Sequence, residues 1–251
     1  MAEPERRIAL LIDADNAPAA KIDVILAEVA RHGVANVRRA YGNWKSPHLK
    51  SWESTLHEYA IRPIQQFAYS SGKNASDMAM VIDAMDLLYA RNLDGFAIVS
   101  SDADFTPLVM RLLTDGVKVY GFGERKTPAP FVNACTTFLF VETLGQPEAA
   151  ETSVSEKPRT GKELRGDTRL VHMLRTSVNA ATREDGWALL SSVGTQIRNQ
   201  ASFDERNYGY RNISGLIEAT ELFELKRNDK IVWIREKAGG SGKQAAKPAK
   251  S

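Results

Sequence analysis

The feature that most constrains this chain is an alternation of short apolar runs with longer segments of helical periodicity, from the N-terminus to about residue 145. Runs such as IALLI and FAIVS have the length and composition of buried strands, whereas PAAKIDVILAEVARHG and SDMAMVIDAMDLLYARN repeat apolar residues at helical spacing. This alternation predicts an α/β fold, in which a mainly parallel sheet carries helices on both faces. In such folds, sites form beyond the carboxyl ends of the strands.

A different pattern follows the first domain, residues 1–145. Residues 146–163 lack apolar periodicity and are rich in Pro, Ser, Thr and charged residues, so they are expected to form a linker. Three helical segments come next, and then two strand-like runs, LFELK and IVWIR, with Asn-Asp turn chemistry between them. These elements predict a winged helix-turn-helix domain over residues 164–237. The small, polar and basic tail, residues 238–251, is expected to be disordered.

The composition limits the cellular compartment in which the chain is expected and the kinds of metal site that it can form. The only cysteine, Cys135, cannot form an internal disulfide, and the four histidines are scattered without zinc-ligand spacing. No segment approaches the ~20 apolar residues of a membrane-spanning helix, and the first apolar run leads directly into acidic residues rather than a cleavage site. These features favour a cytoplasmic protein with no membrane association. The formal net charge of +2 does not by itself indicate a nucleic-acid-binding surface.

Acidic residues follow two of the predicted strands. Asp13 and Asp15 come after the first strand, and Asp102 and Asp104 come after FAIVS. Because the carboxyl ends of parallel strands meet at one edge of the sheet, these two pairs are expected to lie close together. Asp77 stands near the start of a helix, on the face whose later positions are apolar and must pack on the sheet. It is therefore expected to point toward the same edge.

Carboxylates that converge repel one another and raise one another's pKa unless a cation compensates. Convergence of Asp13, Asp77, Asp102 and Asp104 therefore predicts a divalent metal, and oxygen-only ligands suit Mg²⁺ or Mn²⁺. Such an ion holds a scissile phosphate and lowers the pKa of an attacking water. The structural alternative is that Asp and Asn residues at strand ends cap the next helix or form a turn, and Asp15, Asn16 and Asp104 each occupy such a position.

Three further residues border the predicted acidic site. Lys73 precedes the helix of Asp77, where it could meet a phosphate near the positive end of that helix. Trp44 and Lys45 follow another strand, and they offer a ring to stack on an RNA base and a cation for its backbone. A solvated loop is an equally good interpretation of Lys73, and packing under the loop is an equally good one for Trp44.

At these residues the sequence resembles the NYN domain family of PIN-like ribonucleases. The resemblance covers roughly residues 6–143 and is carried by LLIDADN, YGNWKS, GKNASDMAM, SSDADFTPL and VYGFGERKTPAPFVNACTTF. It implies a Rossmann-like three-layer sandwich that cleaves RNA with Mg²⁺ or Mn²⁺. The family's acidic, metal-holding positions match Asp13, Asp77, Asp102 and Asp104. Accompanying polar positions match Asn16 and Ser101, which are expected to complete the catalytic site by orienting the carboxylates or a water.

The segment after the linker resembles the OST-HTH or LOTUS family, through its helical spacing, a Tyr-Gly-Tyr step and a Phe-Glu-Leu step. The resemblance implies RNA binding and, as in some members, a helicase or other RNA-processing partner. Arg206, Tyr208, Tyr210 and Arg211 form a basic and aromatic group ahead of the third helix, and they are candidate RNA contacts. Alternatively, the tyrosines pack on the wing and the arginines are solvated.

These patterns favour a metal-dependent ribonuclease, expected to be an endonuclease, whose winged helix recruits RNA through a tether. One alternative is an RNA-binding adaptor that keeps the acidic residues without turnover. Another is a haloacid-dehalogenase-like phosphatase, which also places D-x-D after the first strand of a doubly wound sheet. The phosphatase pattern fits less well, because Asn16 directly follows Asp15 and no Thr or Val stands two residues after it. No residue pattern specifies an oligomeric state.

Overall fold

The chain forms two compact units in the computed structural model, which describes residues 5–67, 75–90, 92–145, 158–200, 202–228 and 231–237. The first unit spans residues 1–155 and also takes in residues 201–207, and the second spans residues 156–200 and 208–251. In the described part of the chain, no helix is long and apolar enough to cross a membrane.

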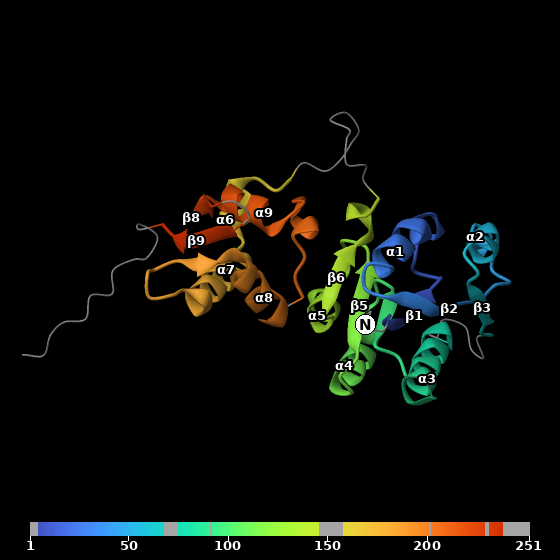
Figure 1. Ribbon diagram of the computed structural model, residues 1–251. Coiled ribbons are helices and arrows are strands. Elements are labelled where there is room, and N and C mark those ends of the chain that lie inside the picture. The colour runs from blue at the N-terminus through green and yellow to red at the C-terminus, as the bar shows by residue number, and fades with distance from the viewer. Residues whose placement is uncertain are drawn as a thin grey trace, which may run out of the picture. The chain divides into compact units, whose positions relative to one another are not determined.

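A six-stranded sheet forms the centre of the first unit, in the order β3-β2-β1-β4-β5-β6 (Figure 1). Its strands are β1 (Arg7–Asp13), β2 (Val34–Gly42), β3 (Arg62–Gln65), β4 (Gly95–Val99), β5 (Lys118–Gly123) and β6 (Thr137–Phe140). All five pairings are parallel. The central strands β1 and β4 are almost wholly buried, as expected for strands that are covered on both faces. The prediction of a parallel α/β sheet is confirmed.

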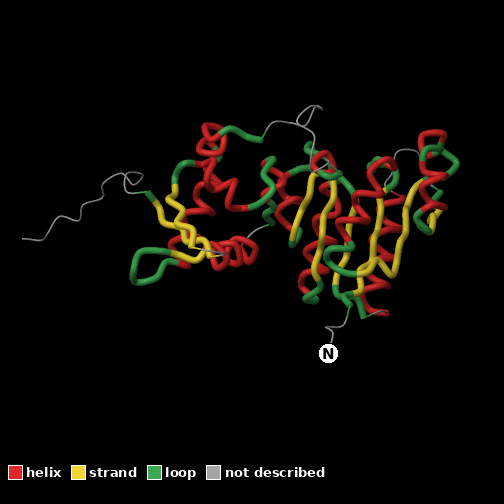
Figure 2. The backbone as a smooth tube through the Cα atoms, turned by 45° about the horizontal axis from the view of Figure 1, so that its top comes forward, coloured by secondary structure: helices red, strands yellow, loops and turns green. Residues whose placement is uncertain are grey.

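Helices cover the two faces of this sheet, which gives three layers (Figure 2). The helices and 3-10 turns are η1 (Ala19–Lys21), α1 (Ile22–Val29), η2 (Pro47–Leu49), α2 (Trp52–Glu58), α3 (Ala75–Ala90), η3 (Ala103–Phe105), α4 (Thr106–Thr114), α5 (Ala129–Ala134) and η4 (Val141–Thr143). Alternate residues of β1 enter opposite cores, because successive strand side chains point to opposite faces. Ile8, Leu10 and Ile12 pack with α1 and α2, whereas Ala9 and Leu11 pack with α3, α4 and α5.

The direction in which strands are added to the sheet reverses between β1 and β4. The carboxyl ends of β1 and β4 therefore lie next to each other in the sheet. The chain proceeds from β1 to β2 and β3 on one side, and β4 then returns to pair with the other side of β1. Ile12 of β1 is in register with Val99 of β4. The loops that leave these two strands therefore begin side by side, at the switch point where ligands bind in open α/β sheets.

The second unit contains helices and a small antiparallel sheet in the order β7-β9-β8. Its elements are α6 (Gly161–Gly166), α7 (Thr168–Ala181), β7 (Ala188–Leu189), α8 (Leu190–Gln200), α9 (Ile213–Thr220), β8 (Phe223–Asn228) and β9 (Ile231–Glu236). The 3-10 turn η5 (Glu205–Tyr208) precedes α9, and its first three residues belong to the first unit. The hairpin of β8 and β9 is the expected wing, and α7, α8 and α9 are the expected helices. The prediction of a C-terminal winged helix-turn-helix is confirmed.

The start of the second unit differs from the sequence-based boundary. Helix α6 begins at Gly161, inside the range expected to be a linker. Thr160 and Glu163 cap it reciprocally: the Thr160 N–H donates to the Glu163 carboxylate (2.6 Å), and the Glu163 N–H donates to the Thr160 hydroxyl (3.3 Å). This capping box is visible in the sequence as Thr-Gly-Lys-Glu. The rest of the expected linker, residues 146–157, and the expected disordered tail lie outside the described residues.

Candidate active site at the carboxyl edge of the sheet

Asp13 is the last residue of β1, and it is only 1% exposed. Its Oδ2 accepts hydrogen bonds from the Ser100 hydroxyl (2.7 Å) and the Asn16 amide (2.9 Å), whereas its buried Oδ1 has no partner among the described residues. Burial raises the pKa of Asp13 above its usual value, although the two hydrogen bonds oppose this effect. A buried carboxylate oxygen without a donor is costly, and a cation bound there would remove that cost.

Ser100 connects Asp13 to the loop that follows β4. Its hydroxyl oxygen accepts the Asp102 N–H (3.0 Å) while its proton goes to Asp13. The Asp102 carboxylate in turn caps η3 by accepting the Asp104 N–H (2.9 Å). One buried serine therefore fixes the backbone of the second acidic pair against the first acidic strand. The capping residue is therefore Asp102, whereas Asp104, at an expected capping position, supplies the N–H that is capped.

Ser101 is the serine that the sequence predicts to orient the carboxylates. In the structure, the neighbouring Ser100 makes the hydrogen bond to Asp13. The Ser101 hydroxyl oxygen accepts the N–H of Glu124 (2.8 Å), at the end of β5. Ser100 faces Asp13 because it continues the buried pattern of β4, and it is 1% exposed. The run of buried residues that ends in Ser-Ser was the signal that could have identified Ser100.

Replacing Ser100 with alanine is expected to leave Asp13 Oδ2 with one donor and the Asp102 N–H without its acceptor. The loss of a donor to a buried carboxylate should raise the pKa of Asp13 further, since the hydrogen bond favours the charged form. We expect Mn²⁺ affinity to fall about tenfold, in line with the loss of a supporting contact at a metal site. Isothermal titration calorimetry of both proteins checks this, and Ser101→Ala is the matched control, expected to bind Mn²⁺ with nearly wild-type affinity.

Asp77 lies in the first turn of α3 and joins the acidic residues of the strand ends. Burial and then the negative charges of Asp13, Asp102, Asp15 and Asp104 raise the pKa of Asp77 to about 6. The neighbouring Ser76 hydroxyl donates to the Asp15 carboxylate (3.1 Å), and this contact ties the start of α3 to the loop after β1. Asp77 thus lies within electrostatic reach of the acidic residues at the ends of β1 and β4.

Two other acidic residues of α3 stay outside the group, because at ~100° per residue Asp83 and Asp86 lie ~120° and ~180° around the helix from Asp77. Asp83 accepts hydrogen bonds from Arg39 and Tyr41 of β2, so its charge is neutralised there. Asp86 is exposed. Asp77 is therefore the residue of α3 that contributes negative charge to the carboxyl edge.

The acidic group is not a ready-made cage of ligands. Over the described residues, no three Asp, Glu, His or Cys side chains are grouped closely enough to enclose a metal ion. The donor set nevertheless fits Mg²⁺ or Mn²⁺, because all its atoms are carboxylate oxygens and one of them is buried with no hydrogen-bond donor in the described parts of the chain. Mg²⁺ typically uses one or two protein carboxylates and keeps several waters, so it does not need a closed cage.

Trp44 does not have the surface position expected of a stacking residue. Its ring is half-buried against the core beside α1 and α2, and its indole N–H donates to the carbonyl of Ile64 (3.0 Å). The packing alternative is therefore correct for Trp44. Lys45 is exposed, and its ammonium nitrogen lies 5.0 Å from the centre of the Phe67 ring. Lys73 lies outside the described residues.

Arg206 is an internal ion-pair partner within the first unit, which corrects its expected role as an RNA contact. Its guanidinium donates to both carboxylate oxygens of Glu28 (2.7 and 2.8 Å) and also to Asp204 (2.7 Å). Burial raises the pKa of Glu28, but the hydrogen bonds from Arg206 and His32 dominate and hold that pKa well below its usual value. Sequence reasoning missed this because the two partners are 178 residues apart.

Replacing Arg206 with alanine is expected to destabilise the protein, because the 6% exposed Glu28 carboxylate would keep its charge and lose its main partner. With allowance for partial exposure of the arginine, the loss is about 1–2 kcal/mol, or a fall in Tm of several degrees. Thermal unfolding followed by circular dichroism measures it. Arg31→Ala is the control, since Arg31 pairs with the same carboxylate from an exposed position and should cost less than about 0.5 kcal/mol.

The two tyrosines of the second unit are engaged within that unit. The Tyr210 hydroxyl donates to the carbonyl of Arg159 (2.6 Å), and the Arg159 guanidinium lies 5.1 Å from the centre of the Tyr208 ring. Burial raises the pKa of the Tyr208 hydroxyl. These contacts are with Arg159, ahead of α6, and not with the wing, whereas Arg211 is exposed.

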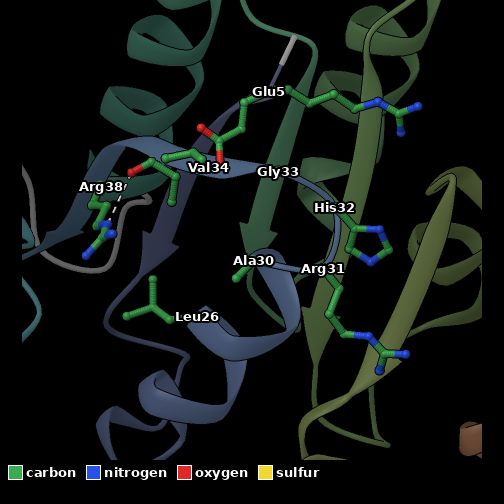
Figure 3. Close-up of a pocket in the computed structure, with 10 residues that line it drawn as sticks. Glu5, Leu26, Ala30, Arg31, His32, Gly33, Val34 and Arg38 are labelled. Carbon is green, nitrogen blue, oxygen red and sulfur yellow. Dashed lines mark hydrogen bonds between the residues drawn. The ribbon is translucent and has the colours of Figure 1, made fainter. Parts of the chain in front are cut away.

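A cavity of about 520 Å³ lies at the opposite edge of the same sheet (Figure 3). Its lining residues include Arg6, directly before β1, Arg31 and His32 in the loop after α1, and Arg38 in β2. The seven residues of β1 separate this edge from Asp13 by about 20 Å, at a rise of about 3.3 Å per residue. The cavity is therefore distinct from the acidic group.

Comparison with known proteins gives two family matches. The model of the NYN domain family matches residues 7–142, and the model of the OST-HTH/LOTUS domain family matches residues 165–234. No curated protein matches the chain.

Two solved structures of proteins of uncharacterised function are similar to parts of the chain. A crystal structure of a protein of unknown function from Vibrio parahaemolyticus is 20% identical, with a TM-score of 0.45, and the match covers 56% of this chain and 95% of that one. A solution structure of an uncharacterised protein from Nitrosomonas europaea is 21% identical, with a TM-score of 0.26, over 40% of this chain and 99% of that one. Neither likeness is close enough to carry an argument.

Proposed function

The chain belongs to the NYN domain family, and on that premise we propose that its first unit is a Mg²⁺- or Mn²⁺-dependent ribonuclease that hydrolyses RNA phosphodiester bonds as an endonuclease. NYN domains are PIN-like nucleases, and OST-HTH/LOTUS domains bind RNA. The observation that carries the proposal is the buried Oδ1 of Asp13, which has no hydrogen-bond partner among the described residues, together with the further carboxylates whose charges act on Asp77 at the same edge.

Each residue of the acidic group has a role in this proposal. Asp13, Asp77, Asp102 and Asp104 would hold the metal. When bound, the ion lowers the pKa of a water and neutralises charge on the leaving oxygen. Ser100 and Asn16 keep Asp13 oriented and favour its charged form, since both donate to the same carboxylate oxygen. No side chain has to act as a nucleophile.

The second unit would recruit the RNA. Two weak RNA sites on one chain raise the apparent affinity, because binding at one site increases the effective concentration of the RNA at the other. A helicase or another RNA-processing protein bound by the winged helix, and a cytoplasmic location, belong to the same proposal. Among the candidate contacts of this unit, exposed Arg211 is the first to test.

The direct test incubates the full-length protein with labelled RNAs and DNAs in the presence of Mn²⁺, Mg²⁺ or EDTA, beside an Asp13→Asn, Asp102→Asn double variant. We expect internal cleavage of RNA that needs the metal and disappears in the variant. Products that shorten progressively from one end would contradict the endonuclease assignment.

The two alternatives give different outcomes in the same experiment. A protein that binds RNA and metal but leaves every RNA intact would be the RNA-binding adaptor. The haloacid-dehalogenase-like phosphatase requires covalent phosphorylation of Asp13, which trapping with a phosphate ester and mass spectrometry would detect. Membership of the NYN family gives that phosphatase no support.

A further inference from the structure

Phe67 is an exposed aromatic residue that follows β3, and it carries a cation on its ring. Its side chain is 54% exposed, and the ammonium nitrogen of Lys45 lies 5.0 Å from the ring centre. A single exposed phenylalanine is common on protein surfaces. Two features distinguish Phe67 and Lys45 from an ordinary exposed pair: hydrogen bonds join the segments that hold them, and both segments lie at the carboxyl edge of the sheet.

The loops that carry Lys45 and Phe67 are fixed to each other by side-chain hydrogen bonds. The Gln65 amide oxygen accepts the Trp44 N–H (2.9 Å), and the Gln65 amide nitrogen donates to the Asn43 side chain (3.1 Å) and to the Gln66 carbonyl (3.1 Å). The Trp44 indole adds its bond to the Ile64 carbonyl. Trp44 thus acts as the anchor that holds Lys45 in place, and a rigid surface loses little entropy when a ligand binds.

Both loops leave the sheet at the edge that carries the carboxylates. Asp13 is in register with Tyr41 of β2, and Tyr41 is in register with Ile64 of β3. With neighbouring strands about 4.8 Å apart, Asp13 and Ile64 lie about 10 Å apart along this row. The loop of Lys45 begins after Gly42, where a β-carbon would lie 3.6 Å from the Asp15 carboxylate.

The charges at this edge explain why such a surface would be needed. Asp13, Asp15, Asp77, Asp102 and Asp104 repel an RNA backbone, so the substrate needs attractive contacts close by. An aromatic ring provides a face that stacks on any base, and a lysine provides a point charge for a phosphate. A base can stack on a side chain only when it is unpaired, which favours single-stranded RNA.

We propose that Phe67 and Lys45 form a stacking platform for one unpaired RNA base beside the scissile phosphate, and that the substrate of this site is therefore single-stranded RNA. The proposal rests on the ribonuclease function proposed above. Phe67 stacks on the base, Lys45 contacts the adjacent phosphate, and Gln65 with Trp44 keeps the two in position.

The chain contains a matched control at the other end of α3. Tyr89 is 67% exposed, and the Arg111 guanidinium lies 5.7 Å from the centre of its ring. Tyr89 lies twelve positions after Asp77 on α3, or about 18 Å along the helix axis. The ring of this second aromatic and cationic pair is at least as exposed as that of Phe67, but the pair lies far from the acidic group.

The test measures binding of a short single-stranded RNA that contains 2-aminopurine, in EDTA, with the full chain carrying Asp13→Asn to prevent cleavage. Stacking on Phe67 is expected to quench the fluorescent base. Phe67→Ala should remove most of the quenching and weaken binding about five- to twentyfold, as for the loss of one stacked base. Phe67→Tyr should restore both, Lys45→Ala should weaken binding less, and Tyr89→Ala should change neither.

The platform is wrong if Phe67→Ala and Tyr89→Ala proteins bind and quench alike, or if a duplex of the same sequence depends on Phe67 as strongly as the single strand does. Its failure is separable from failure of the ribonuclease. A wild-type protein that shows Phe67-dependent quenching but never cleaves RNA would keep the platform and overturn the nuclease. Cleavage by Phe67→Ala with an unchanged KM would overturn the platform alone.

Discussion

An Asp13→Asn protein is expected to fold normally and to lose RNA cleavage by at least about a hundredfold. The asparagine oxygen can take the place of Oδ2 and accept from Ser100 and Asn16, so the local hydrogen bonds persist. Its amide nitrogen then replaces Oδ1, the buried oxygen that no described residue contacts through a hydrogen bond. An amide N–H₂ group is a donor and cannot bind a cation. The loss of about 2.7 kcal/mol or more of transition-state stabilisation corresponds to that fall in rate.

Single-turnover cleavage of a labelled RNA in Mn²⁺ measures the effect, and calorimetric titration of Mn²⁺ without RNA provides a second reading that does not depend on catalysis. Asp86→Asn is the control, because it makes the same chemical change on an exposed part of α3. We expect it to keep wild-type cleavage and Mn²⁺ affinity. If Asp13→Asn bound Mn²⁺ as tightly as the wild type, Asp13 would not be a metal ligand.

Replacing Asp77 with asparagine is expected to stabilise the metal-free protein while reducing cleavage in Mn²⁺ at least tenfold. In the folded protein, burial and four neighbouring carboxylates raise the pKa of Asp77 from 3.8 to about 6. The folded state therefore binds this proton more tightly than the unfolded state, and the contribution of Asp77 to stability falls as pH rises from about 4 to 6. Asparagine carries no charge, so its contribution does not change over that range.

The Tm difference between Asp77→Asn and wild type in EDTA should accordingly be near zero at pH 4 and grow to about 2–5 °C above pH 7. Thermal unfolding across that pH range measures it. Saturating Mn²⁺ should reverse the order at pH 7.5, because the ion stabilises the protein that binds it more tightly. A difference in Tm that is constant with pH would show that the pKa of Asp77 is not raised in the folded protein.

The sheet and its acidic edge could be predicted from the sequence because both follow from local patterns. Buried parallel strands are continuous apolar runs, and helices on their faces repeat at 3.6 residues, so the alternation defines the layers. Once the sheet is parallel, residues after β1 and β4 must lie at one edge, and Asp77 joins them through its helical angle. The capping box of α6 also depends only on neighbouring residues, so it can be recognised in the sequence.

The contacts between distant segments were not accessible in the same way. Ser100 and Ser101 differ only in which one continues the buried side of β4, and Trp44 packs inward because Ile64 offers its indole an acceptor. Arg206 has the same sequence surroundings whether it meets RNA or Glu28. Phe67 belongs to no recognisable sequence motif, and its position near Asp13 follows only from the register of β1, β2 and β3.

The inclusion of residues 201–207 in the first unit makes the structural domain discontinuous in sequence. A polypeptide ending at residue 145 would contain every acidic residue of the proposed site, but it would lack Arg206 and Asn207. Glu28 would then keep a buried negative charge without its main counterion. The carbonyl of Phe138 and the N–H of Phe140 on edge strand β6 would lose the Asn207 side chain that now pairs with both. Truncation at the family boundary therefore separates the catalytic residues from part of their own folding unit.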